Sequence, residues 1–256
     1  MDEHSKGWGN GKDWGAFKTE EYARVLYKRA TGELPEMECS KATAKILSTW
    51  VKDGDSILDV GCGVGHYLRS LSNRLTANFS YTGLDNSPFY IELAEKAFSN
   101  MDRATFCKGD IYQLPFPEKS FDIVMSNNVF LHLPSIERPL RELCRVSRKY
   151  VLIRTLVGER SFLIQEVRTQ GDEFNEDGSP KSFNYYNIYS QAYIEHLLSS
   201  IPEVNKWELA PDNDFNPELI SANAEQSEFQ NVTKMIGDRQ VNGYILQPWV
   251  FIKVFL

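Results

Sequence analysis

Short apolar runs alternate with segments of helical periodicity through the middle of the chain. The apolar run Ser56–Val60 stops at glycines, and His66–Leu75 then repeats leucine at the spacing of one helix face. The alternation predicts strands at Ser56–Val60, Ser80–Leu84, Thr105–Lys108, Phe121–Ser126 and Tyr150–Thr155, and helices at His66–Leu75, Pro88–Phe98 and Ile136–Val146. Strands that alternate with helices of about ten residues indicate a doubly wound α/β fold with a mostly parallel sheet.

The segments on either side of this alternation predict further elements. Helices are expected at about Phe17–Ala30, Cys39–Val51 and Gln191–Ser200, a strand at Asn205–Ala210, and a long polar region at Pro211–Asn242. After Arg154 the rhythm breaks, and Val157–Gly178 ends in the acidic, turn-rich GDEFNEDG, which predicts a surface insertion. Trp249–Leu256 has no polar face and predicts a strand well inside the sheet. One domain is therefore expected over residues 1–256.

The charge and the cysteines exclude several classes of protein. The net charge is −7 over 256 residues, and Val157–Gln240 alone holds 15 acidic and 6 basic residues. A nucleic-acid partner is not expected, because phosphate binding requires Lys and Arg gathered on one face. The four cysteines form no CxxC pair, which argues against a metal site. With no leader-like start and no apolar stretch of about 20 residues, we expect no membrane partner and a cytoplasmic location.

The segment Ile57–His66, ILDVGCGVGH, carries the most chemical information. Its glycines follow a predicted strand and precede a helix, so the main chain can approach a ligand closely beside unpaired N–H groups. The dinucleotide fingerprint GxGxxG would place a glycine where this chain has His66, which argues against pyrophosphate binding. A tight turn with a purely structural role is the alternative.

Two acidic residues follow the next two predicted strands. Asp85 ends the second strand in YTGLDNS, and Asp110 follows the third in FCKGDI. A carboxylate at the first position can accept from both ribose hydroxyls, and one at the second can accept from an exocyclic amine. Each could instead cap the helix that follows. Ligands bind at the carboxyl ends of strands in such sheets, which favours a common site.

The segments ILDVGCGVG, GLDNS and KGDIYQLPFPEKSFDIVMSNNVFLHL together resemble the motif set of class I S-adenosylmethionine-dependent methyltransferases of the type 11 group. The resemblance covers about Ser56–Arg154. It implies a Rossmann-like, seven-stranded sheet with an antiparallel last strand, and methyl transfer from S-adenosyl-L-methionine. The resemblance does not specify the acceptor, and a hydroxyl or amine of a small molecule is the leading hypothesis. A methyltransferase-like cofactor-binding or regulatory protein is the alternative, and a nicotinamide-dependent oxidoreductase is a third hypothesis.

The resemblance also implies roles for parts of the chain and for single residues. Together with the pattern of the flanking segments, it divides the domain into an N-terminal arm with helices (1–50), a cofactor-binding core (56–155), an insertion that caps the substrate (156–190) and the completion of the sheet (191–256). The residues assigned to the cofactor are Gly61, Cys62, Gly63 and Gly65 in the loop, Asp59 to orient that loop, Asp85, Asn86 and Ser87 at the ribose, Asp110 and Ile111 at the adenine, and Asn127 at the amino group.

Catalysis and acceptor binding have weaker signals. The stretch Asn127–Phe130 lacks the prolines of enzymes that methylate nucleic-acid bases. His132 is the candidate general base, although its apolar neighbours favour a structural histidine beside the cofactor. The candidate acceptor-binding residues are Tyr22, Tyr185, Tyr186 and Tyr189. Alternatively, Tyr186, Tyr189 and Tyr193 form one buried helix face. For Trp8, Trp14 and Tyr22 the two alternatives are a lid over the cofactor and ordinary packing.

Overall fold

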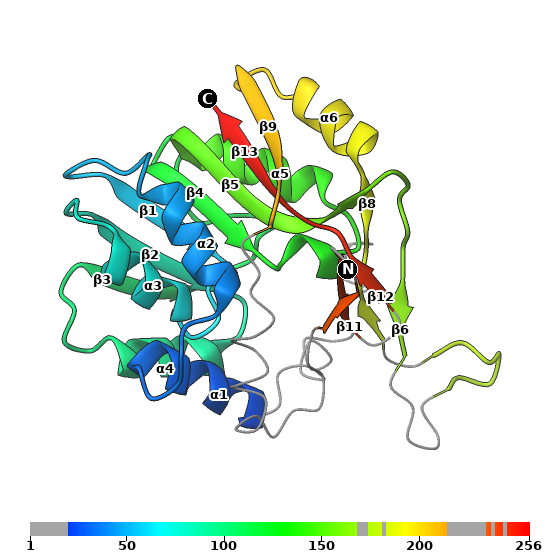
Figure 1. The fold of residues 1–256 in the computed structure, drawn as a ribbon, viewed down its shortest axis with the longest axis horizontal. Coiled ribbons are helices and arrows are strands. Elements are labelled where there is room, and N and C mark those ends of the chain that lie inside the picture. The colour runs from blue at the N-terminus through cyan, green and yellow to red at the C-terminus, as the bar shows by residue number, and fades with distance from the viewer. Residues whose placement is uncertain (1–19, 168–173, 181–182, 214–233, 237–238, 243–244) are drawn as a thin grey trace.

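The computed structural model describes residues 20–167, 174–180, 183–213, 234–236, 239–242 and 245–256 (Figure 1). Its centre is a sheet in the strand order β3-β2-β1-β4-β5-β13-β9. The strands are β1 Ser56–Val60, β2 Ser80–Asp85, β3 Ala104–Lys108, β4 Phe121–Asn127, β5 Ser147–Gly158, β9 Lys206–Pro211 and β13 Trp249–Phe255. Strand β13 is antiparallel to both β5 and β9, whereas β1 to β5 pair in parallel. The predicted fold class, including the antiparallel last strand, is confirmed.

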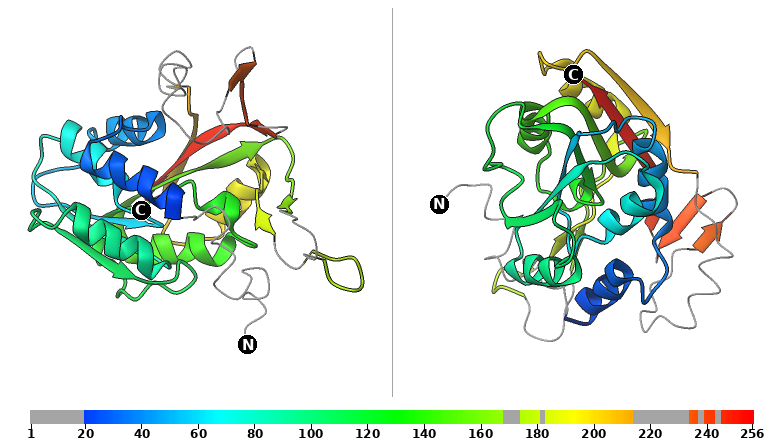
Figure 2. Two further views of the ribbon diagram at one scale, coloured as in Figure 1. Left: turned by 90° about the horizontal axis from the view of Figure 1, so that it is seen from below. Right: turned by 90° about the vertical axis from the view of Figure 1, so that its left-hand side faces the viewer.

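Helices cover both faces of this sheet (Figure 2). They are α1 Glu20–Thr31, α2 Glu38–Leu47, α3 His66–Arg74, α4 Pro88–Ala97, α5 Glu137–Val146 and α6 Gln191–Ser199, with a short 3₁₀ helix η3 at Phe130–His132. Side chains alternate across a strand, so Val124 of β4 packs in the cluster of α5 and α6, while its neighbours Ile123 and Met125 pack in the cluster of α2 and α3. The sheet is therefore the middle of three layers.

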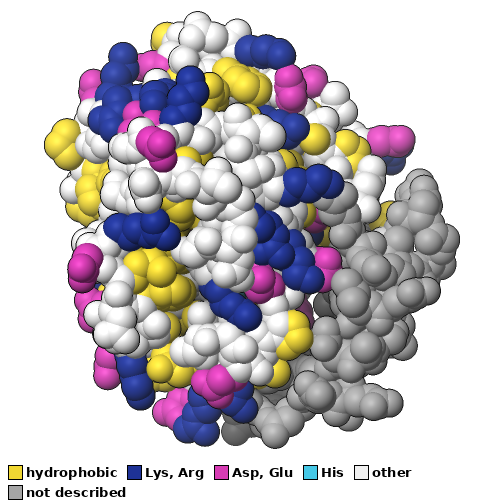
Figure 3. All heavy atoms as spheres, turned by 60° about the vertical axis from the view of Figure 1, so that its left-hand side comes forward, with side chains coloured by type: hydrophobic (Ala, Val, Ile, Leu, Met, Phe, Trp, Pro, Cys, Tyr) yellow, Lys and Arg dark blue, Asp and Glu magenta, His cyan; other side chains and the backbone are white. Residues whose placement is uncertain are grey.

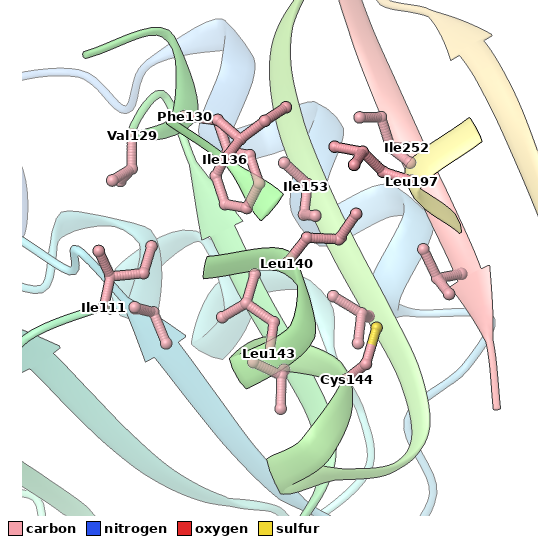
Figure 4. Packing of buried hydrophobic residues seen from close by; sticks show 14 of the residues in the cluster. Ile111, Val129, Phe130, Ile136, Leu140, Leu143, Cys144, Ile153, Leu197 and Ile252 are labelled. Carbon is pink, nitrogen blue, oxygen red and sulfur yellow. The ribbon is translucent and has the colours of Figure 1, made fainter. Parts of the chain in front are cut away.

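The larger core cluster lies between the sheet and α5. Leu140, Leu143 and Cys144 recur at the spacing of one helix face and are buried against Ile153 of β5 and Ile252 of β13 (Figure 4). Burying one leucine side chain contributes about 1.5–3 kcal/mol. The outer face of α5 is charged, with Arg141 and Glu137 exposed and paired.

Several expected elements differ from the observed ones. Strand β5 is longer than the predicted Tyr150–Thr155, because β4 and β13 pair with it on either side and the short β8, Tyr189–Ser190, pairs with its end. The helix predicted near Gln191–Ser200 is confirmed as α6, but Tyr186 and Tyr189 precede it, so the alternative in which they share a helix face with Tyr193 is wrong. Two small sheets were not predicted: β6 Gln165–Glu166 with β7 Asn184–Tyr185, and β10 Lys234–Ile236 with β11 Arg239–Asn242 and β12 Ile245–Gln247.

The surface carries charges of both signs. On the face shown in Figure 3, Lys and Arg side chains lie scattered among Asp and Glu side chains. In the described part of the chain, none of the helices combines the length and the apolar character that crossing a bilayer requires. Within the same residues, His, Cys, Asp and Glu side chains form no group of three that could hold a metal ion.

Candidate cofactor site

The glycine loop lies at the carboxyl ends of four neighbouring parallel strands, β3, β2, β1 and β4. The N–H groups of Gly61 and Cys62 both donate to the carbonyl oxygen of Leu84 in β2, at 2.7 and 3.0 Å. The Gly63 N–H donates to Asp85 Oδ2 at 2.9 Å. Main-chain hydrogen bonds thus fasten the loop to the end of the second strand.

The first glycine is required by packing against another loop. Gly61 has a φ of 80°, and a Cβ atom at this position would lie 2.3 Å from Val129 Cγ2. An alanine would therefore combine an unfavourable left-handed backbone with a steric overlap. Gly61 thus allows the loop after β1 to lie directly against the loop after β4, whereas the sequence had suggested only close approach to a ligand.

The two predicted carboxylates both accept hydrogen bonds from the main chain. Asp85 Oδ1 accepts from the Ser87 N–H at 2.9 Å, and Asp110 Oδ1 accepts from the Tyr112 N–H at 2.9 Å. Each therefore closes a turn with the residue two positions later, and Ser87 is the N-cap of α4. A carboxylate has acceptor positions for about four donors. The turn fixes the direction of each carboxylate, and its contact with the cofactor stays a prediction.

The surroundings of these residues differ. Asp85 is buried and Asp110 is exposed, while Asn86 is exposed at the tip of the turn after β2. Ile111 is buried beside Asp110 in the larger core cluster, and its contact with the adenine stays a prediction. Gly65 has a φ of 74° and directly precedes α3.

Asp59, the acid expected to orient the loop, is fully enclosed below it. Its Oδ2 accepts from the Tyr81 hydroxyl of β2 at 2.7 Å. Burial raises the pKa of Asp59 to about 7, opposed by that hydrogen bond and increased by the nearby charge of Asp85. Asp59 therefore joins β1 to β2, and a role toward the loop stays a prediction.

Asn127 supplies the test of whether the site fits a ligand. Its side chain is 5% exposed, its Oδ1 lies 3.2 Å from Thr43 Oγ1, and its Nδ2 has no hydrogen-bond partner among the described residues. The Thr43 hydroxyl has only one proton, and its Oγ1 also lies 2.9 Å from the Cys39 carbonyl oxygen. That proton can therefore be donated either to Cys39 or to Asn127. Whichever way the amide is turned, one buried polar atom of Asn127 therefore lacks a described partner. Such an atom costs free energy unless a ligand or water pairs with it.

A second such atom lies next to the glycine loop. His66 Nδ1 is buried without a hydrogen-bond partner among the described residues, and the His66 ring lies 3.8 Å from the place of a Gly63 Cβ. Burial and the nearby charge of Arg29 lower the pKa of His66 to about 3, so the ring is neutral at pH 7. Two buried polar atoms beside one glycine loop fit a site made for a polar ligand.

His132 is held by the insertion that follows β5. Its Nδ1 lies 2.8 Å from the main-chain oxygen of Tyr185, and its ring meets the edge of Tyr186 with centroids 5.7 Å apart. A carbonyl oxygen only accepts, so Nδ1 carries the proton and the neutral ring keeps its lone pair on Nε2. That tautomer is the one a general base requires, although the same contact also fits a structural histidine.

Three of the four candidate tyrosines follow β5 in the chain, and they separate into two groups. Tyr189 is 3% exposed, and its hydroxyl lies 3.3 Å from the Phe130 oxygen and 3.1 Å from the Leu133 oxygen. These contacts fit a core residue rather than a pocket wall. Tyr185 and Tyr186 are half-buried, and Gln247 of β12 donates to the Tyr186 hydroxyl.

Tyr22, the fourth candidate, lies in α1, which packs against α3 and α4 at the same edge. Burial raises the pKa of Tyr186 to about 12; the Gln247 hydrogen bond opposes this rise, and the charges of Glu166 and Tyr22 add to it. The other two residues of the predicted lid, Trp8 and Trp14, lie outside the described residues.

Sequence reasoning missed a buried polar cluster beside Asn127. Arg154 of β5 pairs with Asp212, and it also donates to Asn128. One signal was present, because Arg154 is the only charged residue in the apolar run Tyr150–Thr155. Asp212 gave none, since it lies in a region that reads as polar throughout.

Comparison with known proteins adds the family. The family model of a methyltransferase domain matches residues 51–200, which is more than half of the chain. The chain belongs to this family, and the resemblance to class I S-adenosylmethionine-dependent methyltransferases is confirmed.

Similar proteins share only part of their length with this chain. A sterol 24-C-methyltransferase of Pneumocystis carinii is 39% identical over 104 residues, which are 39% of this chain and 27% of that protein. A second one, from Aspergillus fumigatus, is 36% identical over 99 residues, 38% of this chain and 26% of that protein. The matched segment thus spans about a quarter of the length of these relatives.

Solved structures agree on the fold. A SAM-dependent methyltransferase from Methanosarcina mazei has a TM-score of 0.53 at 17% identity, covering 82% of this chain and 96% of that one. A [4+2]-cyclase has a TM-score of 0.51 at 18% identity, covering 73% of this chain and 66% of that one. Likeness at this level of identity concerns the fold alone.

Proposed function

We propose that this chain transfers the methyl group of S-adenosyl-L-methionine to a small-molecule acceptor. The observation that carries the proposal is the convergence of the glycine loop, Asp85 and the incompletely paired Asn127 amide on one sheet edge in a chain of the methyltransferase family. The cofactor, when bound, supplies an activated methyl group for an in-line displacement. The protein then has to bind, align and exclude water.

Each residue at the edge has a task in this proposal. Asp85 accepts hydrogen bonds from the ribose, and Asp110 together with Ile111 frames the adenine. The Asn127 amide, turned so that its oxygen faces the site, accepts from the amino group of the cofactor. The main chain of Gly61, Cys62 and Gly63 lies along the methionine part. The family resemblance and the common position of these residues at one sheet edge support the assignments.

The acceptor side is formed by His132, Tyr185, Tyr186 and Tyr22. The polar-tipped rings suit a partly polar small molecule, and the Nε2 lone pair of His132 can take a proton from a hydroxyl or amine. The sterol methyltransferases among the relatives act on a carbon atom, as their names state, which favours an apolar acceptor as a second candidate. The cytoplasmic location and the lack of a nucleic-acid partner stay predictions.

A labelling experiment tests the function directly. The purified chain is incubated with methyl-labelled S-adenosylmethionine and either a polar metabolite extract or a sterol extract, and labelled products are identified by mass spectrometry. Label in a hydroxyl or amine of a polar product supports the first candidate, and label on a sterol carbon supports the second. Binding of S-adenosylhomocysteine without labelled product from any extract would support a binding or regulatory protein instead.

Two matched tyrosine variants test the acceptor side. Tyr186→Phe is expected to reduce turnover per folded molecule, because the Tyr186 ring lies against His132, and to lower stability by about 1 kcal/mol, because the buried Gln247 amide loses its acceptor. Tyr189→Phe removes a buried hydroxyl that contacts two main-chain oxygens, so it should lower stability by about 1 kcal/mol and preserve activity per folded molecule. Turnover and thermal unfolding are measured on both variants. Equal turnover in both would remove Tyr186 from the acceptor site.

A further inference from the structure

We propose that Arg154 is a positioning residue for the cofactor site, which acts by fixing Asn128 and thereby the Asn127 amide. The role rests on the function proposed above. Asn127 and Arg154 are register partners in the pairing of β4 with β5. Arg154 therefore lies beside the point where β4 leaves the sheet and enters the loop that continues to His132.

Asn128 has a main-chain conformation that needs support. Its φ is 59°, in the left-handed region, which few residues other than glycine adopt, although asparagine is more tolerant than most. Such a conformation persists where the surroundings determine it. The Asn128 N–H donates to the Arg154 carbonyl oxygen at 2.9 Å, and Arg154 Nη1 donates to Asn128 Oδ1 at 2.6 Å. One residue thus holds both the main chain and the side chain of Asn128.

Asp212 and Trp249 hold the Arg154 side chain. Its Nε and Nη2 lie 2.7 and 2.6 Å from Asp212 Oδ2, and its guanidinium carbon lies 3.9 Å from the centre of the Trp249 ring. The side chains of Arg154 and Asp212 are 5% and 4% exposed. A guanidinium group presents several donors in one rigid plane, so it can pair with Asp212 and reach Asn128 at once. A lysine ammonium could pair with Asp212 but lacks this planar array.

The same cluster reaches the glycine loop. Asn128 Nδ2 donates to the Tyr67 hydroxyl at 3.3 Å, and this hydroxyl donates to Cys39 Sγ at 3.3 Å. Tyr67 lies in the first turn of α3, the helix that begins directly after the loop. The loop after β4 and the loop after β1 are thereby held to one another. Binding groups displaced by even about 1 Å lose much of their effect, so the loss of Arg154 should weaken cofactor binding.

The substitution Arg154→Lys tests the role while keeping a charge beside Asp212. Dissociation constants for S-adenosylhomocysteine are measured by calorimetry, and folding is followed by urea denaturation. R154K is expected to weaken binding about tenfold. The control is R148K, because Arg148 also pairs with an aspartate, Asp122, at 2.8 Å but lies at the opposite edge of the sheet. R148K is expected to leave the dissociation constant unchanged.

A double-mutant cycle distinguishes positioning from a general structural effect. If Arg154 acts through Asn127, then R154K should weaken binding by less than about twofold when Asn127→Ala is already present. The pair R154M/D212N removes both buried charges together and should show the same tenfold loss as R154K. Wild-type affinity in folded R154K, or an undiminished effect of R154K in the N127A background, would overturn the proposal.

The conformation of Asn128 gives an independent check. Glycine adopts the left-handed region freely, so N128G should bind S-adenosylhomocysteine more tightly than N128A, by about fivefold or more. Equal losses in the two variants would show that the Asn128 conformation is not what Arg154 maintains, and would overturn the assignment. A wild-type chain that binds no S-adenosylhomocysteine would instead refute the proposed function, so the two failures are distinguishable.

Discussion

The amino ends of the parallel strands form one edge of the central sheet, and their carboxyl ends form the opposite edge. These two edges contain similar side chains in different arrangements. At the amino edge, Asp122 accepts from the Ser56 N–H at 3.0 Å, from Arg148 at 2.8 Å and from Lys149 at 3.0 Å. At the carboxyl edge, Asp85 accepts from the main chain of its own loop and of the glycine loop, while the Asn127 amide keeps an atom without a described partner.

The difference separates an edge whose side chains pair with one another from the edge that carries the proposed site. At the amino edge, side chains of β1, β4 and β5 satisfy each other, and Arg148 and Lys149 remain 41% and 42% exposed, so each ion pair contributes little. At the carboxyl edge, main-chain groups direct the polar side chains, and Arg154 with Asp212 is almost fully enclosed. Preorganised groups of that kind bind a ligand without first rearranging.

The largest expected effect is on the affinity for S-adenosylhomocysteine, which should depend on the carboxyl edge and not on the amino edge. Asp85→Ala should weaken S-adenosylhomocysteine binding at least tenfold, because it removes charge-assisted hydrogen bonds of about 1.5–3 kcal/mol each. Asp122→Ala should leave the dissociation constant unchanged and lower stability by about 1 kcal/mol. Calorimetry and urea denaturation on both variants measure the two quantities. Unchanged affinity in D85A would confine Asp85 to the turn it closes with Ser87.

A second effect concerns packing at the two edges. Gly61→Ala should destabilise the fold by about 3 kcal/mol, the sum of a left-handed backbone cost and of overpacking against Val129. Gly54 lies in the turn before β1 with a φ of 86°, and an added Cβ there would meet nothing within 4 Å, so Gly54→Ala should cost only about 1 kcal/mol. Urea midpoints provide the comparison. If both alanine substitutions lower stability equally, then the contact between Gly61 and Val129 leaves room for a Cβ atom.

The pH dependence of the free energy of unfolding should include a contribution from Asp59. Its pKa in the folded state is raised to about 7, so between about pH 4 and pH 7 the native state holds a proton that the unfolded state has released. The stability that Asp59 contributes should therefore fall as the pH rises through this interval, whereas the lowered pKa of His66 makes the contribution of that residue rise with pH over much of the same interval. Asp59→Asn removes one of these two groups, so the stability of wild type relative to D59N, measured by urea unfolding at each pH, should fall between about pH 4 and pH 7. A difference between the two proteins that does not change with pH would contradict the raised pKa.

The smallest expected effect is a loss of stability at acidic pH, through protonation of Asp122. The hydrogen bond from Arg148 holds the pKa of Asp122 well below its usual range. Stability from this group is therefore present above about pH 4 and is lost as the pH falls further. Asp122→Asn should lower stability at pH 7, and the difference from wild type should shrink at pH 3. A difference that stays constant with pH would mean that charge has no part in the contact.

Much of the fold and part of the site could be predicted from local patterns. Strands β1 to β5 could be predicted from short apolar runs, either alternating or continuous, that end at glycines or polar residues. Such patterns are local, because the side chains that share one face of a strand or helix lie only a few positions apart in the chain. The loop Gly61–Gly65, Asp85 and Asp110 follow from the same patterns, since the carboxyl ends of parallel strands meet at one edge. The interior position of β13 followed from its sequence, in which Lys253 is the only polar residue.

Tertiary structure alone decided which polar side chains meet. Tyr186 and Tyr189 are three positions apart and chemically identical, yet one is half-buried beside His132 and the other lies in the core. Asn128 and Arg154 are 26 positions apart, and Arg154 and Asp212 are 58 apart. Hydrophobic periodicity reports which face of an element is buried, but a hydrogen bond depends on the register between distant elements, which no local pattern encodes.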